Sequence, residues 1–265
     1  EQKLSKYFID YHIVPMVSAI WSMPPYQANQ MPLNFFIKFF KNHGLFKIRN
    51  RPQWYTVSNR SKAYVSKVLE SISGEYYKNY PINKIQRNKN GIKVYYGENN
   101  EFFDYEKVIL ATHADQALKL IENPTTIEKK ILSNFQYKKN IAFIHSDDNF
   151  MPKNKKAWSS WNSIIDKNNL ENNSVTYWLN LLQNLKIDKN IFLTLNPFFD
   201  IPENKIFKKV YFTHPYYDKN ALENQKQLQT IQNKENILFC GSYFGYGFHE
   251  DGIKSSLEMI KFFND

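Results

Sequence analysis

The chain has 265 residues, of which 42% are hydrophobic and 17% aromatic, and its formal net charge at pH 7 is +10. A chain of this length and composition can bury a sizeable core. Its single cysteine, Cys240, excludes an internal disulfide, and no apolar run approaches the roughly 20 residues that span a bilayer. These features favour a cytoplasmic protein.

The positive charge favours an anionic partner, either nucleic acid or a phospholipid surface. Much of the surplus is lysine scattered among asparagines, as in KNKK and KNNLENN, and drift in composition explains that scatter more simply. The sequence has no RNP-type aromatic motif, helix-turn-helix pattern or zinc-ligand spacing. We therefore expect no nucleic-acid partner.

Two apolar stretches stand near the beginning of the chain. Residues 8–21 (FIDYHIVPMVSAIW) include Asp10, His12 and Pro15, so we interpret them as core or pocket lining. Residues 33–40 (LNFFIKFF) predict an aromatic helix that is typical of a core and that could also touch a membrane. The opening letters EQKLSKYF have no leader character, and we expect them to come from inside a longer protein.

From Ser73 onward the pattern is β-like. Short alternating runs separated by Asn-Gly and Gly-Glu-Asn-Asn turns predict a meander that leads into a buried strand, Lys107 to Thr112. His113 could cap the helix predicted by the spacing of apolar residues over 114–121. A second helix is expected to begin at a threonine cap, Thr125 or Thr126.

Strand candidates alternate with polar loops between residues 139 and 217, which predicts an antiparallel or mixed sheet. Residues 218–232 predict a surface helix. His145 with Asp147 and Asp148 resembles a metal site only superficially, because no second imidazole stands at a ligand spacing, and we expect no metal. The chain ends with the apolar strand NILFC (236–240), a glycine-rich connection and a helix.

Half of the eight glycines lie in that connection, between residues 241 and 252. Gly241 follows the buried strand, where a glycine lets another group approach the backbone closely. Cys240, inside the strand, is interpreted as a small apolar residue. The aromatic residues of the connection would add flat apolar walls: Tyr243, Phe244, Tyr246 and Phe248.

The last helix is expected to pack on the sheet through an apolar stripe of Ile253, Leu257 and Ile260. Two acidic residues in its first turn complement the helix dipole, and Gly252 leaves the first amide donors uncovered. A strand, a glycine-rich turn and an open helix N-terminus suit electron-rich ligand atoms at the carboxyl end of a sheet. The pattern favours a planar ring that becomes negative on reduction.

The segment FCGSYFGYGFHEDGIKSS closely resembles the C-terminal flavin-contacting segment of FAD-dependent amine-oxidase-like oxidoreductases. It is most similar to a bacterial subgroup of NAD/FAD-binding proteins that resembles phytoene-desaturase-type enzymes and is associated with modification of fatty acyl chains. IVPMVSAIWSMP, VILATHADQAL and FTHPYYD match in the same order, so the resemblance covers nearly the whole chain.

The resemblance implies FAD as the cofactor, and His249 as a candidate catalytic residue that relays a proton or orients the ring; a purely structural hydrogen bond is the alternative. Trp158, Trp161 and Tyr246 are candidate substrate-pocket residues. The implied cofactor contacts are Ile82 at the adenine, Ala111 and Thr112 at a strand end, Gly241 and Ser242 near the ribityl chain and diphosphate, and Gly247, Phe248, His249, Glu250, Asp251, Gly252 and Ile253 around the isoalloxazine ring.

The implied fold class is α/β, of mixed α+β character. The remainder of a Rossmann-like FAD/NAD(P)-binding domain (53–117 and 234–265) would be interleaved with a substrate domain built on a mixed or antiparallel sheet with helices (1–52 and 118–233). Two departures stand out. Asn59, Arg60 and Ser61 replace a Gly-Gly-Ser turn, and no G-x-G-x-x-G motif is present to hold the diphosphate. We therefore expect the chain to lack an N-terminal part and to bind FAD poorly alone.

The resemblance favours hydride transfer from an apolar substrate to the flavin, with a lipid acyl chain as the preferred substrate and a desaturation-like reaction. A flavin amine oxidase is the first alternative. A non-catalytic basic binding or scaffold fragment is the alternative from another class. The expected partners are an apolar small molecule or lipid and, peripherally, the inner face of an anionic membrane; the oligomeric state is left open.

Overall fold

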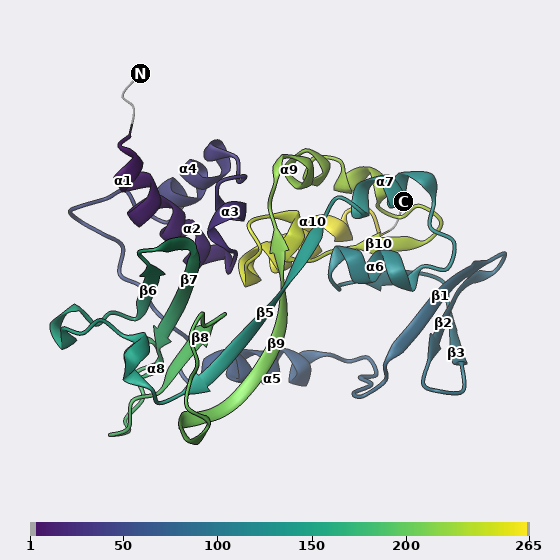
Figure 1. The fold of residues 1–265 in the computed structure, drawn as a ribbon. Helices are drawn as coiled ribbons and strands as arrows, with labels where there is room; N and C mark the ends of the chain where they lie inside the picture. Colours follow the sequence, from purple (N-terminus) through teal and green to yellow (C-terminus); the bar gives the residue numbers. More distant parts are fainter. Residues whose placement is uncertain (1–3, 264–265) are drawn as a thin grey trace. The chain divides into compact units, whose positions relative to one another are not determined.

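The computed structural model describes residues 4–263, which form two compact units (Figure 1). Unit 1 comprises the described part of Glu1–Ile72 and Lys138–His214, and unit 2 comprises Ser73–Tyr137 and the described part of Pro215–Asp265. The chain is thus interleaved, but it divides after residues 72, 137 and 214 rather than after 52, 117 and 233. The roles assigned to the two parts stay predictions. The first three residues of EQKLSKYF, the stretch that we expect to come from inside a longer protein, lie outside the described residues.

Among the residues that the structure describes, unit 1 contains four α-helices and a π-helix up to Asn42 and two further α-helices later in the chain. They are α1 (Lys6–Phe8), the π-helical η1 (Ile9–Ile13), α2 (Val14–Trp21), α3 (Pro25–Ala28), α4 (Leu33–Asn42), α5 (Arg60–Ser71) and α8 (Leu179–Leu182). Trp21 at the end of α2 packs edge-on against Phe39 of α4, with ring centroids 4.8 Å apart. Val14, Val17 and Trp21 are buried, which confirms that residues 8–21 contribute to a core.

The sheet of unit 1 has the strand order β6-β7-β8-β5-β9 within the described residues. Its strands are β6 (Trp161–Asp166), β7 (Asn169–Trp178), β8 (Phe192–Leu195), β5 (Gln136–His145) and β9 (Ile206–Tyr216). β6 with β7, β7 with β8, and β8 with β5 pair antiparallel. The predicted antiparallel or mixed sheet is therefore confirmed. Short 3-10 turns lie between its strands at Asp148–Phe150, Lys155–Ala157 and Glu203–Lys205.

Unit 2 contains the predicted meander and the predicted buried strands. The antiparallel meander is β1 (Ile82–Asn88), β2 (Gly91–Tyr96) and β3 (Glu101–Tyr105), and β4 (Val108–Leu110) pairs parallel with β10 (Ile237–Phe239). Gly91 turns the first hairpin at φ +143°, where a Cβ would lie 2.4 Å from the Tyr105 carbonyl oxygen. The fold class is α/β of mixed character, as the sequence indicates.

The helices of unit 2 are α6 (Ala114–Leu120), α7 (Thr126–Leu132), α9 (Lys219–Gln225) and α10 (His249–Ile260), with 3-10 turns at Leu228–Ile231 and Ser242–Phe244. His113 occupies the N-cap position of α6. Thr125 caps α7: its hydroxyl accepts from the Glu128 N–H at 3.2 Å, and the Glu128 carboxylate accepts from the Thr125 N–H at 2.7 Å. The buried Glu128 carboxylate also pairs with Arg87 of β1, which joins α7 to the meander.

Two predictions about helices are wrong. The stripe of Ile253, Leu257 and Ile260 is 57–61% exposed, and α10 packs on β10 through Met259 instead. A stripe at helical spacing fixes which residues share a face, but another face of α10 carries the small Ser255 and the flexible Met259, and these fit against β10. The surface helix predicted over 218–232 ends at Gln225, and Leu228 and Ile231 are fully buried. Within residues 4–263, no helix is both long and apolar enough to cross a bilayer.

Candidate functional site

The carboxyl ends of β4 and β10 meet at one edge of unit 2. The strands are in register, Ile237 opposite Val108 and Phe239 opposite Leu110, and the Cys240 N–H donates to the Leu110 carbonyl at 3.2 Å. At Gly241, φ is +153°, and a Cβ there would lie 3.3 Å from the Thr112 carbonyl oxygen and 2.8 Å from the Tyr243 ring. Only glycine lets the two strand ends approach this closely.

Side chains beneath the glycine-rich connection hold it in place. The Gln225 side-chain amide of α9 donates to the Tyr243 carbonyl at 2.9 Å and to the Gly245 carbonyl at 2.6 Å. At Gly247, φ is +98°, and a Cβ would lie 2.8 Å from the Tyr217 hydroxyl. Burial raises the pKa of both Tyr217 and Tyr243, so both stay neutral at physiological pH. These contacts hold the backbone of the connection in a defined conformation.

Tyr243 does not form one of the flat apolar walls that the sequence predicts. Its side chain is 1% exposed and belongs to the core of unit 2, where it packs edge-on against Phe135. Phe244 packs against that core and is partly buried, whereas Phe248 is 38% exposed. Tyr246 is half-buried. The fully buried ring of the four therefore supports the connection from inside and offers no surface to a ligand.

The first turn of α10 is less open than the sequence predicts. The Asp251 carboxylate accepts from the Phe248 N–H at 3.0 Å, and the Asp251 and Gly252 N–H groups donate to the Phe248 carbonyl at 3.0 and 3.2 Å. Those two amides are therefore engaged within the helix. The Ser242 and Glu250 N–H groups donate to no other group within residues 4–263.

Gly252 lies next to the Ser242 N–H. Apart from its chain neighbours and the backbone of its own helix, a Cβ built at Gly252 would have only the Ser242 nitrogen, 3.9 Å away, within 4 Å. This position therefore has open space in front of it, unlike Gly241, Gly245 and Gly247. The Ser242 N–H thus lies beside the first turn of α10, and the N-terminal end of a helix can bind electron-rich atoms.

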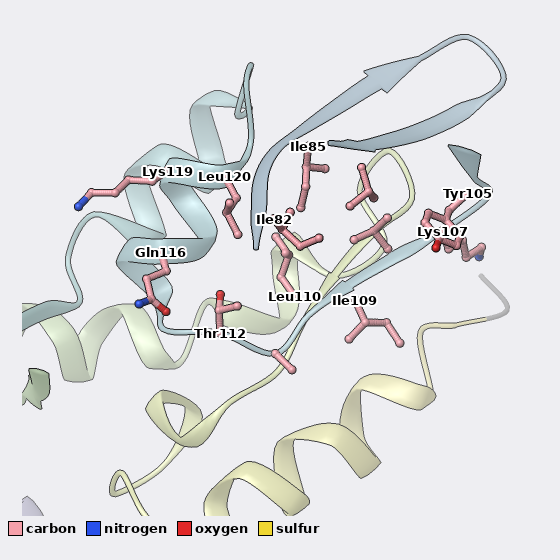
Figure 2. Close-up of a pocket in the computed structure, with 13 residues that line it drawn as sticks. Ile82, Ile85, Tyr105, Lys107, Ile109, Leu110, Thr112, Gln116, Lys119 and Leu120 are labelled. Atoms are coloured by element: carbon pink, nitrogen blue, oxygen red, sulfur yellow. The ribbon is translucent and has the colours of Figure 1, made fainter. Parts of the chain in front are cut away.

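A cavity of about 720 Å³ runs along β4 (Figure 2). Ile82, Ala111 and Thr112, three of the predicted cofactor residues, line it; no residue of the connection 241–253 does. Its other lining residues are mostly apolar, with Ile85 and Leu120 on one side of the strand. Ile109 extends to the opposite side and is 43% exposed. Among the described residues, β10 is the only strand paired with β4, so the cavity follows an open sheet edge.

The structure therefore brings most of the predicted cofactor residues into one region of unit 2. Ala111, Thr112, Gly241 and Ser242 stand at the strand ends, with Gly247 to Ile253 in the adjacent connection and helix. His249 is the exposed first residue of α10. Cys240 is buried, which agrees with its interpretation as a small apolar residue.

The two tryptophans predicted to line a pocket belong to unit 1. The Trp158 indole N–H donates to the Pro152 carbonyl at 2.7 Å, and its ring packs edge-on against Trp178. Trp161 is 42% exposed and lines a cavity of about 190 Å³ with Tyr11, Pro15 and Met16. No Asp, Glu, Lys or Arg among the described residues lines that cavity.

The group around His145 is a buried polar network in unit 1. The His145 imidazole accepts from the Asp147 N–H at 3.1 Å and pairs with the Thr194 hydroxyl at 2.7 Å, and Asp147 pairs with Lys205 at 2.8 Å. Burial lowers the pKa of His145 to about 4, so the ring is neutral at pH 7. No group of metal-ligating side chains with suitable spacing occurs in the described part of the chain.

The turn before α5 retains a conformation that glycine favours. Asn59 has φ +62° and Arg60 has φ +67°, both in the left-handed region. These are the two positions at which the resemblance leads us to expect glycines. The backbone path is therefore kept despite the two side chains, at a cost in strain for Arg60 in particular.

Sequence reasoning missed the residues that support the connection. Gln225 lies within a predicted surface helix, and nothing in its sequence context indicates that its amide bonds two carbonyls of a segment some twenty residues further on. Ser255 accepts from the Gly241 N–H at 2.9 Å. A small side chain on an amphipathic helix indicates close packing, and the sequence GIKSS contains this signal.

The fold of the chain is shared with solved enzyme structures at low sequence identity. A cyclohexylamine oxidase from Brevibacterium oxydans IH-35A matches with a TM-score of 0.60 and 12% identity, covering 99% of this chain and 66% of that one. A protein provisionally named protoporphyrinogen oxidase, from Exiguobacterium sp. 255-15, matches at 0.61 and 12%, covering 96% and 63%. A CLA-producing fatty acid isomerase from P. acnes matches at 0.53 and 10%, covering 76% and 51%.

The chain thus has the fold of these proteins and spans between about half and two thirds of their length. No family model matches the sequence, and no curated protein matches it. At these identities the likeness concerns the fold alone.

Proposed function

We propose that the chain is part of an FAD-dependent oxidoreductase whose flavin lies against the carboxyl ends of β4 and β10. The observation that carries the proposal is the convergence of the two strand ends on Gly241, beside the unpaired Ser242 N–H and the first turn of α10. Crevices of this kind are where open α/β sheets hold their ligands. The fold shared with an oxidase structure supports the same assignment.

Bound FAD would supply an acceptor for a hydride from the substrate. The Ser242 and Glu250 N–H groups would donate to electron-rich atoms of the cofactor, and the positive end of the α10 dipole would favour negative charge there. Gly252 leaves room for a close approach. Ile82, Ala111 and Thr112 would contact another part of the cofactor near the carboxyl end of β4. His249, exposed at the same turn, would move or hold a proton at its imidazole.

The open edge of β4 supports a further part of the proposal. Among the described residues β4 pairs only with β10, so its other edge is open to a further strand. A strand-helix unit with a glycine-rich phosphate loop, which the sequence does not contain, would complete this edge and hold the diphosphate. We therefore expect the 265 residues alone to bind FAD weakly.

The favoured substrate is apolar, with a lipid acyl chain as the first choice. The cavity beside Trp161 has a mixed lining in which His12, Asn162 and Ser163 accompany aromatic and apolar side chains, and no Asp, Glu, Lys or Arg among the described residues lines it. The shared fold occurs both in a protein named a fatty acid isomerase and in one named a cyclohexylamine oxidase, so an amine is the competing substrate class.

The test is an absorption spectrum of the purified full-length protein, followed by anaerobic titration with acyl lipids and, separately, with amines. Flavin bands that bleach with an acyl lipid are expected. Bleaching with amines alone would replace the substrate assignment but keep the flavin. A full-length protein without flavin bands, and without any spectral change on adding FAD, would contradict the proposal. A salt-dependent shift with nucleic acid would then favour a binding fragment.

A further inference from the structure

Most of the net positive charge of the chain lies in one segment. Between Tyr11 and Leu69 the sequence contains eight Lys or Arg and no Asp or Glu, against a net charge of +10 for all 265 residues. The remainder of the chain is therefore nearly balanced. This segment belongs wholly to unit 1. The charge is thus more concentrated than the scattered lysines of the polar loops suggest, and it creates a local field that attracts anions.

One face of α4 carries exposed apolar side chains within that segment. Leu33 and Ile37 stand one turn apart and are 66% and 44% exposed, and Lys41 continues the same row after another turn. The opposite face is buried through Phe36, Phe39 and Phe40. The aromatic face that the sequence predicts as core is therefore core, while the aliphatic row is left in water.

Ring contacts and hydrogen bonds fix the loop after α4 against the helix. The His43 ring stacks on Phe39 at 4.0 Å, and its Nδ1–H donates to the Phe39 carbonyl at 2.8 Å. The Phe46 ring lies 5.3 Å from that of Phe40. The Arg51 guanidinium donates to the Lys47 carbonyl at 2.7 Å. Figure 1 shows the chain running on from here to α5 without a helix or strand.

The fixed loop exposes large apolar side chains between basic ones. Ile48 is 89% exposed and Tyr55 is 88% exposed, and Trp54 is 61% exposed. Lys47 and Arg49 flank Ile48 in the sequence. A cavity of about 430 Å³ opens between the loop and the end of α4, with Lys41, Lys47, Trp54 and Tyr55 among its lining residues. The apolar row of α4 and the loop therefore meet at Lys41.

We propose that this basic-aromatic surface, formed by Leu33, Ile37, Lys41, Lys47, Ile48, Arg49, Trp54 and Tyr55, docks unit 1 on a bilayer that contains anionic phospholipid. Tryptophan and tyrosine favour the headgroup region, exposed aliphatic side chains bury themselves at the acyl boundary, and lysine and arginine pair with lipid phosphates. The absence of acidic residues from the segment matches the charge of such a membrane. Nucleic acid accounts for the charge but not for Leu33, Ile37 and Ile48. The inference is independent of the flavin.

The experiment is sedimentation of the full-length protein with phosphatidylcholine vesicles, with and without 30% phosphatidylglycerol, at low and high salt. Two patch variants are compared: Lys47→Glu with Arg49→Glu, and Ile48→Ser with Tyr55→Ser. None of these four side chains makes a hydrogen bond or ion pair within residues 4–263, so the fold is expected to survive. The matched control is Lys167→Glu with Lys208→Glu, two exposed lysines of unit 1 outside the surface.

Native protein is expected to sediment with phosphatidylglycerol vesicles, less so at high salt. The charge-reversal variant should bind the anionic vesicles at least about tenfold more weakly. The serine variant should lose the part of the vesicle binding that the native protein retains at high salt. The control should bind like the native protein. Failure of the native protein to bind anionic vesicles, or an equal loss in the control, would overturn the proposal. The proposal would also be overturned if the serine variant bound vesicles like the native protein but lost a concentration-dependent dimer or lost RNA binding.

Discussion

The Ser255 hydroxyl joins the glycine-rich connection to the last helix: it accepts from the Gly241 N–H at 2.9 Å and donates to the Gly252 carbonyl at 2.7 Å. The side chain sits where α10 meets the end of β10 and is almost completely buried. The geometry of the proposed flavin edge thus depends on one hydroxyl that no sequence motif identifies as functional.

Ser255→Ala is expected to lower the free energy of unfolding by about 1–2 kcal/mol, because it leaves the Gly241 N–H without its acceptor. Chemical denaturation measures this. Ser256→Ala is the matched control, since Ser256 also donates to the Gly252 carbonyl, at 3.0 Å, but does not bond Gly241. Equal losses in the two variants would show that the contact with Gly241 contributes nothing.

Gly252→Ala separates folding from cofactor binding. The added methyl group meets open space, and alanine is the better helix former, so we expect stability to rise by about 0.5–1 kcal/mol. Flavin titration of the full-length protein is expected to show weaker binding, because the methyl group stands where the ring would approach. Unchanged flavin affinity would remove Gly252 from the site.

Gly245→Ala provides the contrast within the same connection. Its Cβ would lie within 3 Å of the Asp251 carboxylate, which caps the Phe248 N–H. We expect this variant to lose about 1–3 kcal/mol of stability, because the crowding displaces the cap. A thermal melt as high as that of the native protein would show that the capping arrangement is not needed.

The buried imidazole of His145 predicts a loss of stability in acid. Burial lowers its pKa from the ordinary 6.5 to about 4, with Asp147 opposing and Lys205 assisting the shift. The stability is complete above pH 6.5. As the pH falls from 6.5 toward 4, the unfolded chain takes up a proton that the folded chain refuses, and up to about 3 kcal/mol is lost. His145→Gln, which keeps a donor and an acceptor, is expected to flatten unfolding curves measured across this range.

Asp147 adds a separate effect at lower pH. Burial raises its pKa, but the hydrogen bonds from Lys205 and Asn149 outweigh this and the net shift is downward. The contribution of ionised Asp147 to the stability of the fold is therefore complete above its ordinary pKa and is lost only below it.

A stability profile of His145→Gln as steep as that of the native protein between pH 6.5 and 4 would contradict the assignment to His145.

The two faces of α10 give a direct test of the corrected packing. Leu257→Gln changes an exposed side chain and is expected to leave the stability of this chain within about 0.5 kcal/mol. Met259→Ala removes a buried side chain that packs on Leu238 and Cys240, and should cost about 2–4 kcal/mol. Thermal melts of the two variants compare them directly, and the reverse ranking would restore the packing that the sequence predicts.

Local patterns predicted much of the fold. The turns of the meander, the apolar strand before His113, the threonine cap of α7 and the alternating strands of unit 1 each depend on neighbouring residues, and each is present. The orientation of α10 could not be obtained this way. Its spacing identifies a stripe correctly, but which face meets the sheet depends on the space that β4 and β10 leave.

The candidate site was likewise predictable from the sequence only in part. The close approach at Gly241 follows from its place after a buried strand, and the structure contains it. The engagement of the Asp251 and Gly252 amides with Phe248 depends on the exact turn geometry, which the residue types do not determine. The contacts of Gln225 and Tyr217 with the connection arise from the tertiary fold, and no local pattern predicts them.

The parallel pairing of β4 with β10 has a consequence for biosynthesis. Val108 pairs with Ile237, which is synthesised much later, so this pair cannot form until Ile237 has left the ribosome. Until then the apolar strand and the cavity beside it face the solvent. Translation thus leaves the region proposed to take the cofactor incomplete until the last strand emerges, and we expect an early-acting chaperone to bind it.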